Sequence, residues 1–299
     1  MSQVVDRTFV DVPGASLVLG AALEAADPRG ASRTLRSAAS TLDLVDARAK
    51  AIAEERSVLL AVGSGGEALA LRWFAPGATT SIHDHGFWGA AVVIDGADRY
   101  ERFDIVDDQA RLDATLWLEP DDAVWWAGPP ADVHRQTGVG AGALELVVVG
   151  GPPTGSTYEE HDHLGDVRPL ADAVRAAYLE NDAAELAGWY AEDVIADLCV
   201  PAWRFQVRGR DPLLELLARE EFGLPDQRLV SLRTLPLRSG VVVETAVRFS
   251  HGNETGAWRD LHVLRTRDGF VVEHLAYCTG RWDATAIAAQ ETTAPMVRP

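Results

Sequence analysis

Three histidines have the residue type and spacing of a metal site. His83 and His85 are two residues apart, so on a β-strand both side chains point to the same face. His134 can complete one side of a coordination shell from a neighbouring strand. Neutral imidazole suits iron, zinc, copper or nickel. Three such ligands would leave positions on the metal open, where a substrate or dioxygen could bind.

Other residues near this constellation have two interpretations each. Trp88, Trp125 and Trp126 could line a substrate pocket, or they could be barrel core, because indole rings bury much apolar area. His161 and His163 form a second pair of histidines, but they lie among acidic residues after a Pro/Gly-rich stretch. We therefore expect that second pair to be part of a solvated loop.

The elements that must position the three histidines are short strands. From Val58 onward the apolar period is two, and Gly, Pro and Asp turn signals interrupt it at near-even intervals, which predicts a barrel or jelly roll. We expect strands at 67–74, 79–83, 87–95, 98–106, 111–118, 122–127, 131–136 and 142–150. Helical periodicity over 16–26 and again over 31–55 predicts helices that cover this barrel.

A second pattern begins after a Gly/Pro-rich and acidic stretch. Helices are expected at 169–180, 183–191 and 211–221, and strands at 225–235, 239–250, 256–266 and 269–279. Helices followed by an antiparallel run of strands are typical of an α+β domain. The Ala/Thr/Pro-rich residues 284–299 are expected to be a flexible tail.

Composition limits the classes of function. The chain has 299 residues, 47% hydrophobic, with a formal net charge of −18, which argues against nucleic acid and anionic membranes as partners. Two cysteines, Cys199 and Cys278, provide no disulfide framework and fit a reducing cytosol. The apolar stretch 17–26 is broken by Gly20 and Glu24, so we expect no signal peptide, no membrane span and a cytoplasmic location.

The spacing around the histidines resembles the cupin family. The first cupin motif, Gly-x5-His-x-His-x3-Glu-x6-Gly, is matched at Gly77, His83, His85 and Gly96, with Gly89 in place of the glutamate. The second motif, Pro-x-Gly-x2-His-x3-Asn, is represented by Pro129, Ala131, His134 and Gly138, so its histidine is present. This resemblance implies a double-stranded β-helix whose metal has three histidine ligands and no carboxylate.

Within the cupins, the run from His83 to Gly89 resembles bacterial thiol dioxygenases of the cysteine dioxygenase type. That resemblance implies Fe(II), dioxygen and oxidation of a small thiol, and it makes Arg56 the expected partner of a substrate carboxylate. It covers about residues 30–152. The family's Ser-x-His-x-Tyr run on the last strand is replaced here by Glu145, Val147 and Val149. Glu145 is therefore a candidate polar group in the pocket, and Trp88 is a further candidate substrate-binding residue.

Residues 169–283 resemble the SnoaL-like branch of the nuclear-transport-factor cone fold. The resemblance is carried by the runs 184–197, 200–212, 257–262 and 272–277. It implies helices around a curved sheet, with a pocket that serves acid–base chemistry in some relatives and only ligand binding or dimerisation in others. The pocket residues expected here are Asp197, Trp203, Trp258, Asp260, His262 and Tyr277.

The sequence thus predicts a mainly β protein with an added α+β unit. The expected parts are a cupin domain with N-terminal helices (1–152), a linker (153–168), a SnoaL-like domain (169–283) and the tail. The small-molecule substrate is expected to be a thiol or amino-acid-like compound, oxidised by O2 at Fe(II), with zinc, nickel, manganese or copper as alternative metals. A homodimer is the expected assembly.

Three other functions fit the same pattern. The metal could act as a Lewis acid in an isomerase or lyase, which would work without oxygen. The chain could be bifunctional, with a second reaction in the C-terminal domain. It could also be a binding protein whose cupin senses a ligand without turnover.

Overall fold

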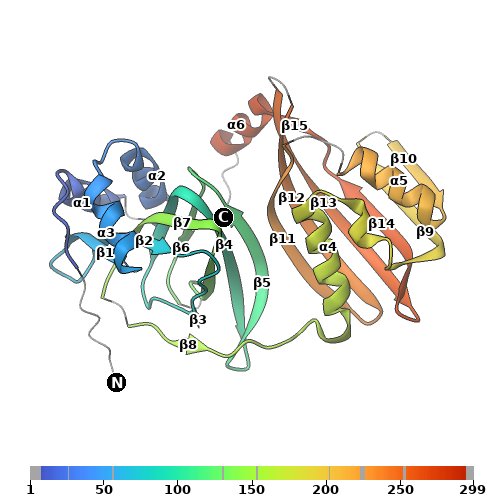
Figure 1. The fold of residues 1–299 in the computed structure, drawn as a ribbon, viewed down its shortest axis with the longest axis horizontal. Helices are drawn as coiled ribbons and strands as arrows, with labels where there is room; N and C mark the ends of the chain where they lie inside the picture. The colour runs from blue at the N-terminus through green and yellow to red at the C-terminus, as the bar shows by residue number, and fades with distance from the viewer. Residues whose placement is uncertain are drawn as a thin grey trace. The chain divides into compact units, whose positions relative to one another are not determined.

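The computed structural model describes residues 8–25, 27–55, 57–129, 131–152, 154–201, 203–222, 226–251 and 254–293. These residues form two compact units, which divide between His161 and Asp162 (Figure 1). Strands dominate both units. In the described residues, no helix has both the length and the apolar character needed to span a bilayer.

Three helices cover the strands of the first unit: α1 (Ala15–Glu24), α2 (Pro28–Ala39) and α3 (Val45–Glu54). Asp27 caps α2 by accepting a hydrogen bond from the Gly30 amide at 2.8 Å. The sequence predicted one helical region over 31–55, and this prediction was wrong. The helix stops because the Ser40 and Thr41 hydroxyls bond to carbonyls of its last turn.

The first unit is a curved sheet built around two long strands. Its strands are β1 (Ser57–Val62), β2 (Ala68–Phe74), β3 (Ile82–His83), β4 (Gly89–Val106), β5 (Gln109–Leu118), β6 (Ala123–Trp126), β7 (His134–Val149) and β8 (Thr157–Tyr158). The order is β1-β2-β7-β4-β5, with β6 on β4, β3 on β7 and β8 on β3. All these pairings are antiparallel.

Glycines let β4 and β7 bend without breaking. The sequence predicted two strands in place of each, with breaks near Gly96 and Gly138. The structure keeps both continuous, because Gly96 takes a φ of +77° and a side chain there would meet the Gly142 carbonyl oxygen at 1.9 Å. β7 therefore pairs with β4 on both sides of its own bend. β1 has no counterpart among the predicted strands.

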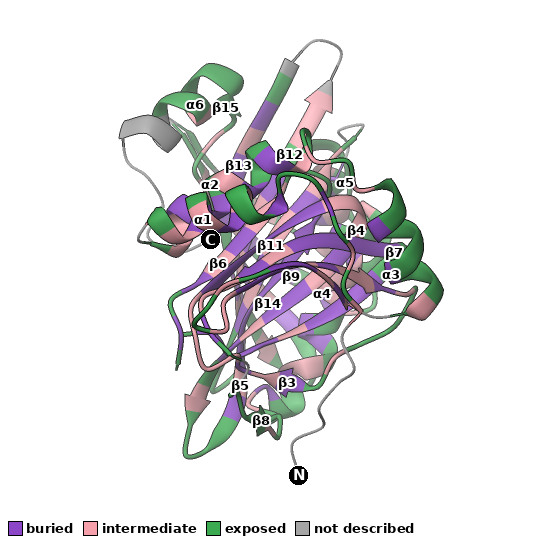
Figure 2. Ribbon diagram, turned by 90° about the vertical axis from the view of Figure 1, so that its left-hand side faces the viewer, coloured by how far each residue is buried: buried purple, intermediate pink, exposed green. Residues whose placement is uncertain are grey.

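Alternation along these strands separates two apolar clusters. The helix-facing cluster packs α1–α3 against one face of the sheet and includes Leu35, Leu69, Leu71, Leu144 and Leu146. The interior cluster lies on the other face and includes Val93, Tyr100, Leu116, Val124 and Trp126. Buried residues run along the strands, and exposed residues mark the outer faces of the helices (Figure 2).

The second unit is a sheet with helices. Its main elements are η1 (Gly165–Val167), α4 (Arg168–Glu180), η2 (Ala183–Leu186), β9 (Tyr190–Val200), β10 (Trp203–Arg208), α5 (Arg210–Glu220), β11 (Arg228–Leu237), β12 (Gly240–His251), β13 (Glu254–Arg267) and β14 (Phe270–Cys278). The order is β11-β12-β13-β14-β9-β10, and β14 pairs in parallel with β9. A short β15 (Trp282–Asp283) pairs with β13.

Two predictions for this unit were wrong. The helix expected at 183–191 is a single 3-10 turn, after which β9 begins, and neither β9 nor β10 was predicted. Tyr190 is buried in the unit, so tertiary packing overrides the helical pattern there. The expected flexible tail contains helix α6 (Ala284–Thr293), while residues 294–299 lie outside the described ranges.

Leu35→Ala tests the helix-facing cluster. Leu35 is fully buried, so we expect the substitution to lower the free energy of unfolding by about 2–5 kcal/mol through lost packing and a residual cavity. Urea denaturation followed by circular dichroism measures this. Leu17→Ala is the control, because Leu17 is 79% exposed and should change stability by less than about 0.5 kcal/mol. Equal effects would contradict the assigned packing.

Candidate metal centre and a second buried site

Strand pairing brings the three histidines together. His83 in β3 lies directly opposite His134 in β7, and His85 follows β3 by two residues. Their ring centroids are 4.6 Å apart for His83 and His134, 5.0 Å for His83 and His85, and 4.9 Å for His85 and His134. One nitrogen from each ring lies within 4.8 Å of the other two. This is the geometry of a three-histidine group that could hold a metal.

Backbone carbonyls orient two of these rings. His83 Nδ1 donates to the Ser81 carbonyl at 2.9 Å, and His134 Nδ1 donates to the Asp132 carbonyl at 2.6 Å. Each bond leaves the Nε2 lone pair free to bind a metal. His134 Nε2 and His85 Nδ1 are buried and have no hydrogen-bond partner in the described part of the chain. Orphaned nitrogens that converge in this way fit a metal cation.

Burial keeps all three rings neutral. It lowers the pKa of His83, lowers the pKa of His85 to about 3, and lowers that of His134 well below its usual range. The positive charge of Arg72 contributes to each of these shifts. Only the unprotonated imidazole can bind a metal. At neutral pH these histidines are already unprotonated, so metal binding would release no proton from them.

Asp132 is the residue that ties two ligands together. Its carbonyl orients His134, and its carboxylate accepts hydrogen bonds from the His85 amide at 2.9 Å and the Gly86 amide at 3.3 Å. Asp84 fixes the other side of the loop, since it accepts a hydrogen bond from the Tyr158 hydroxyl at 2.6 Å. Sequence reasoning missed Asp132, although its position two residues before His134 was available as a signal.

Aromatic rings pack against the histidines from inside the unit. Trp126 stacks on His85 with centroids 4.9 Å apart, and Tyr100 stacks on His134 at the same distance. Trp88, the tryptophan predicted to line the pocket, instead packs against the helix-facing cluster. Trp125 also packs against that cluster, although it precedes Trp126 directly on β6, because neighbouring residues of a strand point to opposite faces.

A small cavity of about 110 Å³ lies beside His85. Apolar side chains from β1, β2 and β7 form most of its wall, among them Leu59, Val147 and Val149. Of the lining residues that the structure describes, Arg72 is the one with a permanent charge. Sequence reasoning missed Arg72.

Of the two polar residues predicted for this pocket, the structure describes one, Glu145. Arg56, the expected substrate anchor, lies outside the described residues. Glu145 is fully buried on β7, directly opposite Arg72 on β2, and accepts a hydrogen bond from Gln136. Glu145 thus belongs to the interior of the first unit, on the same strand face as Val147.

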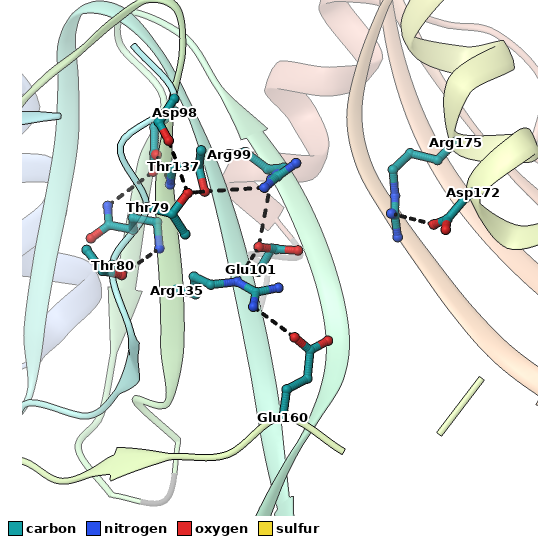
Figure 3. Close-up of polar contacts among 12 residues, drawn as sticks. Thr79, Thr80, Asp98, Arg99, Glu101, Arg135, Thr137, Glu160, Asp172 and Arg175 are labelled. Atoms are coloured by element: carbon teal, nitrogen blue, oxygen red, sulfur yellow. Dashed lines mark hydrogen bonds and ion pairs between the residues drawn. The ribbon is translucent and has the colours of Figure 1, made fainter. Parts of the chain in front are cut away.

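Polar contacts hold the two long strands together around the centre. The Thr137 amide donates to Asp98 at 3.0 Å (Figure 3). Arg135 bridges Glu101 on β4 at 2.7 Å and Glu160 at 2.8 Å, which ties the end of the first unit to the start of β7. Because Arg135 directly follows His134, this bridge also limits the movement of that ligand.

The second unit contains a chain of buried polar side chains. The Tyr190 hydroxyl lies 2.9 Å from His274 Nδ1, and His274 Nε2 lies 3.0 Å from His262 Nδ1. His262 Nε2 lies 2.8 Å from the Tyr178 hydroxyl and 3.2 Å from a Glu221 oxygen. Tyr178 also donates a hydrogen bond to Glu221. The inner end of this chain is buried, and its outer end reaches a pocket.

That pocket has a volume of about 570 Å³ and is lined by Asp260, His262, Glu221, Trp258 and Cys278, among others. Burial, and then the nearby charge of Glu221, raise the pKa of Asp260 to about 6. Burial lowers the pKa of His262, but Glu221 outweighs it and the net pKa is raised. A carboxyl group with a pKa near neutrality can accept or donate a proton at physiological pH.

The expected pocket residues of the second unit do not all converge. Trp258, Asp260 and His262 line the pocket. Asp197 and Tyr277 lie on the opposite face of the sheet, where Asp197 binds Arg204, and Trp203 is 69% exposed. The prediction grouped the two faces because it lacked β9 and β10, whose register decides which residues share a face.

No family model matches the chain, and no curated protein matches it. Similar solved structures include an NTF2-like protein of unknown function from Mesorhizobium loti, 20% identical, covering 41% of this chain and 98% of that chain (TM-score 0.32). They also include an uncharacterized conserved protein with a double-stranded β-helix domain from Klebsiella pneumoniae. It is 16% identical, and the match covers 35% of this chain and 86% of that chain (TM-score 0.27). A recombinant oxalate oxidase in complex with glycolate is 18% identical, and the match covers 34% of this chain and 55% of that chain (TM-score 0.29).

Asp132→Ala tests the ligand-orienting role of this residue. The substitution removes the acceptor for the His85 and Gly86 amides, so we expect the affinity for Zn²⁺ to fall about 10–100-fold. Competition with a chromophoric chelator measures the affinity. Asp104→Ala is the matched control, because Asp104 is exposed on β4. If both variants bind Zn²⁺ as the wild type does, Asp132 has no such role.

Proposed function

We propose that the first unit is a metal-dependent enzyme of the three-histidine cupin type. The observation that carries this proposal is the convergence of three neutral imidazoles, one buried and two half-buried, each with one nitrogen within 4.8 Å of the other two. Such a centre supplies a Lewis-acidic or redox-active cation with open coordination positions. Fe(II) with O2 as cosubstrate is the leading assignment, because the resemblance to thiol dioxygenases adds to a ligand set that accepts several metals.

The cavity favours a small substrate that carries an anionic group. Its volume of about 110 Å³ is below the range of about 300–1,000 Å³ of drug-sized pockets. Arg72 lines this cavity, and a guanidinium forms two parallel hydrogen bonds with a carboxylate, which supports an anionic substrate. Apolar walls exclude water from the reacting end, which strengthens the charge interaction. A thiol or amino-acid-like carboxylate in the cytoplasm is the proposed substrate.

Oxygen consumption tests this function. The protein is reconstituted with Fe(II) without air and mixed with oxygen and a panel of small carboxylates, with and without a thiol. We expect uptake with at least one thiol, and none for His134→Ala. Arg72→Met should raise KM at least tenfold and change kcat less, because it removes a substrate contact and leaves the three histidines in place.

The outcomes separate the related functions. Turnover that persists without oxygen would select an isomerase or lyase. Failure to bind any metal would remove the proposed function altogether. His161→Ala is the control, because His161 is exposed and lies apart from the three ligands in sequence.

A second candidate function belongs to the second unit. Asp260, with its pKa near 6, faces a 570 Å³ pocket beside His262, which favours proton transfer to or from a carbon acid. As a base, Asp260 must be deprotonated, so the rate should rise as the pH increases through about 6. Deuterium exchange into small ketones, followed by NMR, measures this. Asp260→Asn should abolish exchange and Asp197→Asn, on the other face, should not.

A further inference from the structure

Two carboxyl groups face each other inside the first unit. Asp98 on β4 is 1% exposed and Glu145 on β7 is fully buried. A single amide bridges them, because Gln136 Nε2 donates to Asp98 at 3.1 Å and to Glu145 at 2.9 Å. Neither residue has a role in the function proposed above.

Such a pair keeps a proton at neutral pH. Two adjacent buried carboxylates repel each other, which favours the state in which one of them is protonated. Burial raises the pKa of both groups, and the proximity of Glu145 raises that of Asp98 further. Glu145 Oε1 has no hydrogen-bond partner within the described ranges. The charged and titratable groups that face the pair are Arg72 on β2 and Tyr100 on β4.

The Asp98–Glu145 pair is connected to His134 through Gln136 and Tyr100. Gln136 is two residues from His134 on the same face of β7, about 7 Å along the strand. Tyr100 is two residues from Asp98 on β4, and its ring stacks on His134. The histidines are neutral before a metal binds, so the charge of a divalent cation enters a buried site without the release of a histidine proton.

We propose that Asp98 and Glu145 hold one proton between them and release it to solvent when a divalent cation binds to His83, His85 and His134. The pair then carries two negative charges, which offset the added charge of the cation. The inference rests on the metal site of the proposed function and is independent of the reaction there. Its consequence is that metal affinity rises about tenfold per pH unit around neutrality.

Calorimetry with Zn²⁺ alone tests the inference on the full chain. Titrations at pH 7 in buffers of different ionisation enthalpy give the number of protons released per metal bound. We expect about one proton more for the wild type than for the double variant Asp98→Asn/Glu145→Gln, which keeps the shape of both side chains. Asp113→Asn is the matched control, because Asp113 is a buried carboxylate on β5 paired with Arg102.

Infrared spectroscopy provides a second measurement that needs no variant to fold. The metal-free wild type should show the carbonyl band of a neutral carboxylic acid, and Zn²⁺ should remove it. Equal proton release by the wild type and the double variant, or a band that persists with metal bound, would overturn this inference. Absence of metal binding to the wild type would instead overturn the proposed function.

Discussion

The pairing of β3 with β7 is the interaction on which the first unit's chemistry depends. β3 has only two residues, yet its register places His83 directly across from His134. Neighbouring strands are about 4.8 Å apart, so a cross-strand pair and a histidine two residues on are already within reach of one ion. The backbone carbonyls of Ser81 and Asp132 then fix how two of the rings turn. The backbone therefore sets the relative placement of the three rings as much as the side chains do.

Sequence reasoning identified the histidines because ligand spacing is local along each motif. Alternation also identified most strands of the first unit, since one face of each strand is buried. It did not identify Arg72 or Asp132, because their roles depend on contacts between strands that are distant in the sequence. It also named Trp88 as the tryptophan of the substrate pocket, whereas Trp126 is the one that packs on His85. The face on which a strand residue lies reverses when the strand shifts by one residue, so this choice could not be made from sequence.

The second unit shows the same division between local and non-local information. Alternation along β13 correctly grouped Asp260 with His262. The parallel pairing of β14 with β9 could not be read from periodicity, because a helix-like pattern covers the start of β9. That pairing decides which face of the sheet holds Asp197. His274 packs on His262 because both side chains point to the inner face of the sheet.

Asp132 contacts two of the three candidate metal ligands at once, one through its carbonyl and one through its carboxylate. His85 and His134 are therefore mechanically coupled, although they are 49 positions apart in the sequence. A displacement of this one residue would turn one ring and shift the main chain of the other together. Partial coordination by two histidines is then a poor resting state, and capture or loss of an ion should proceed as a single concerted event.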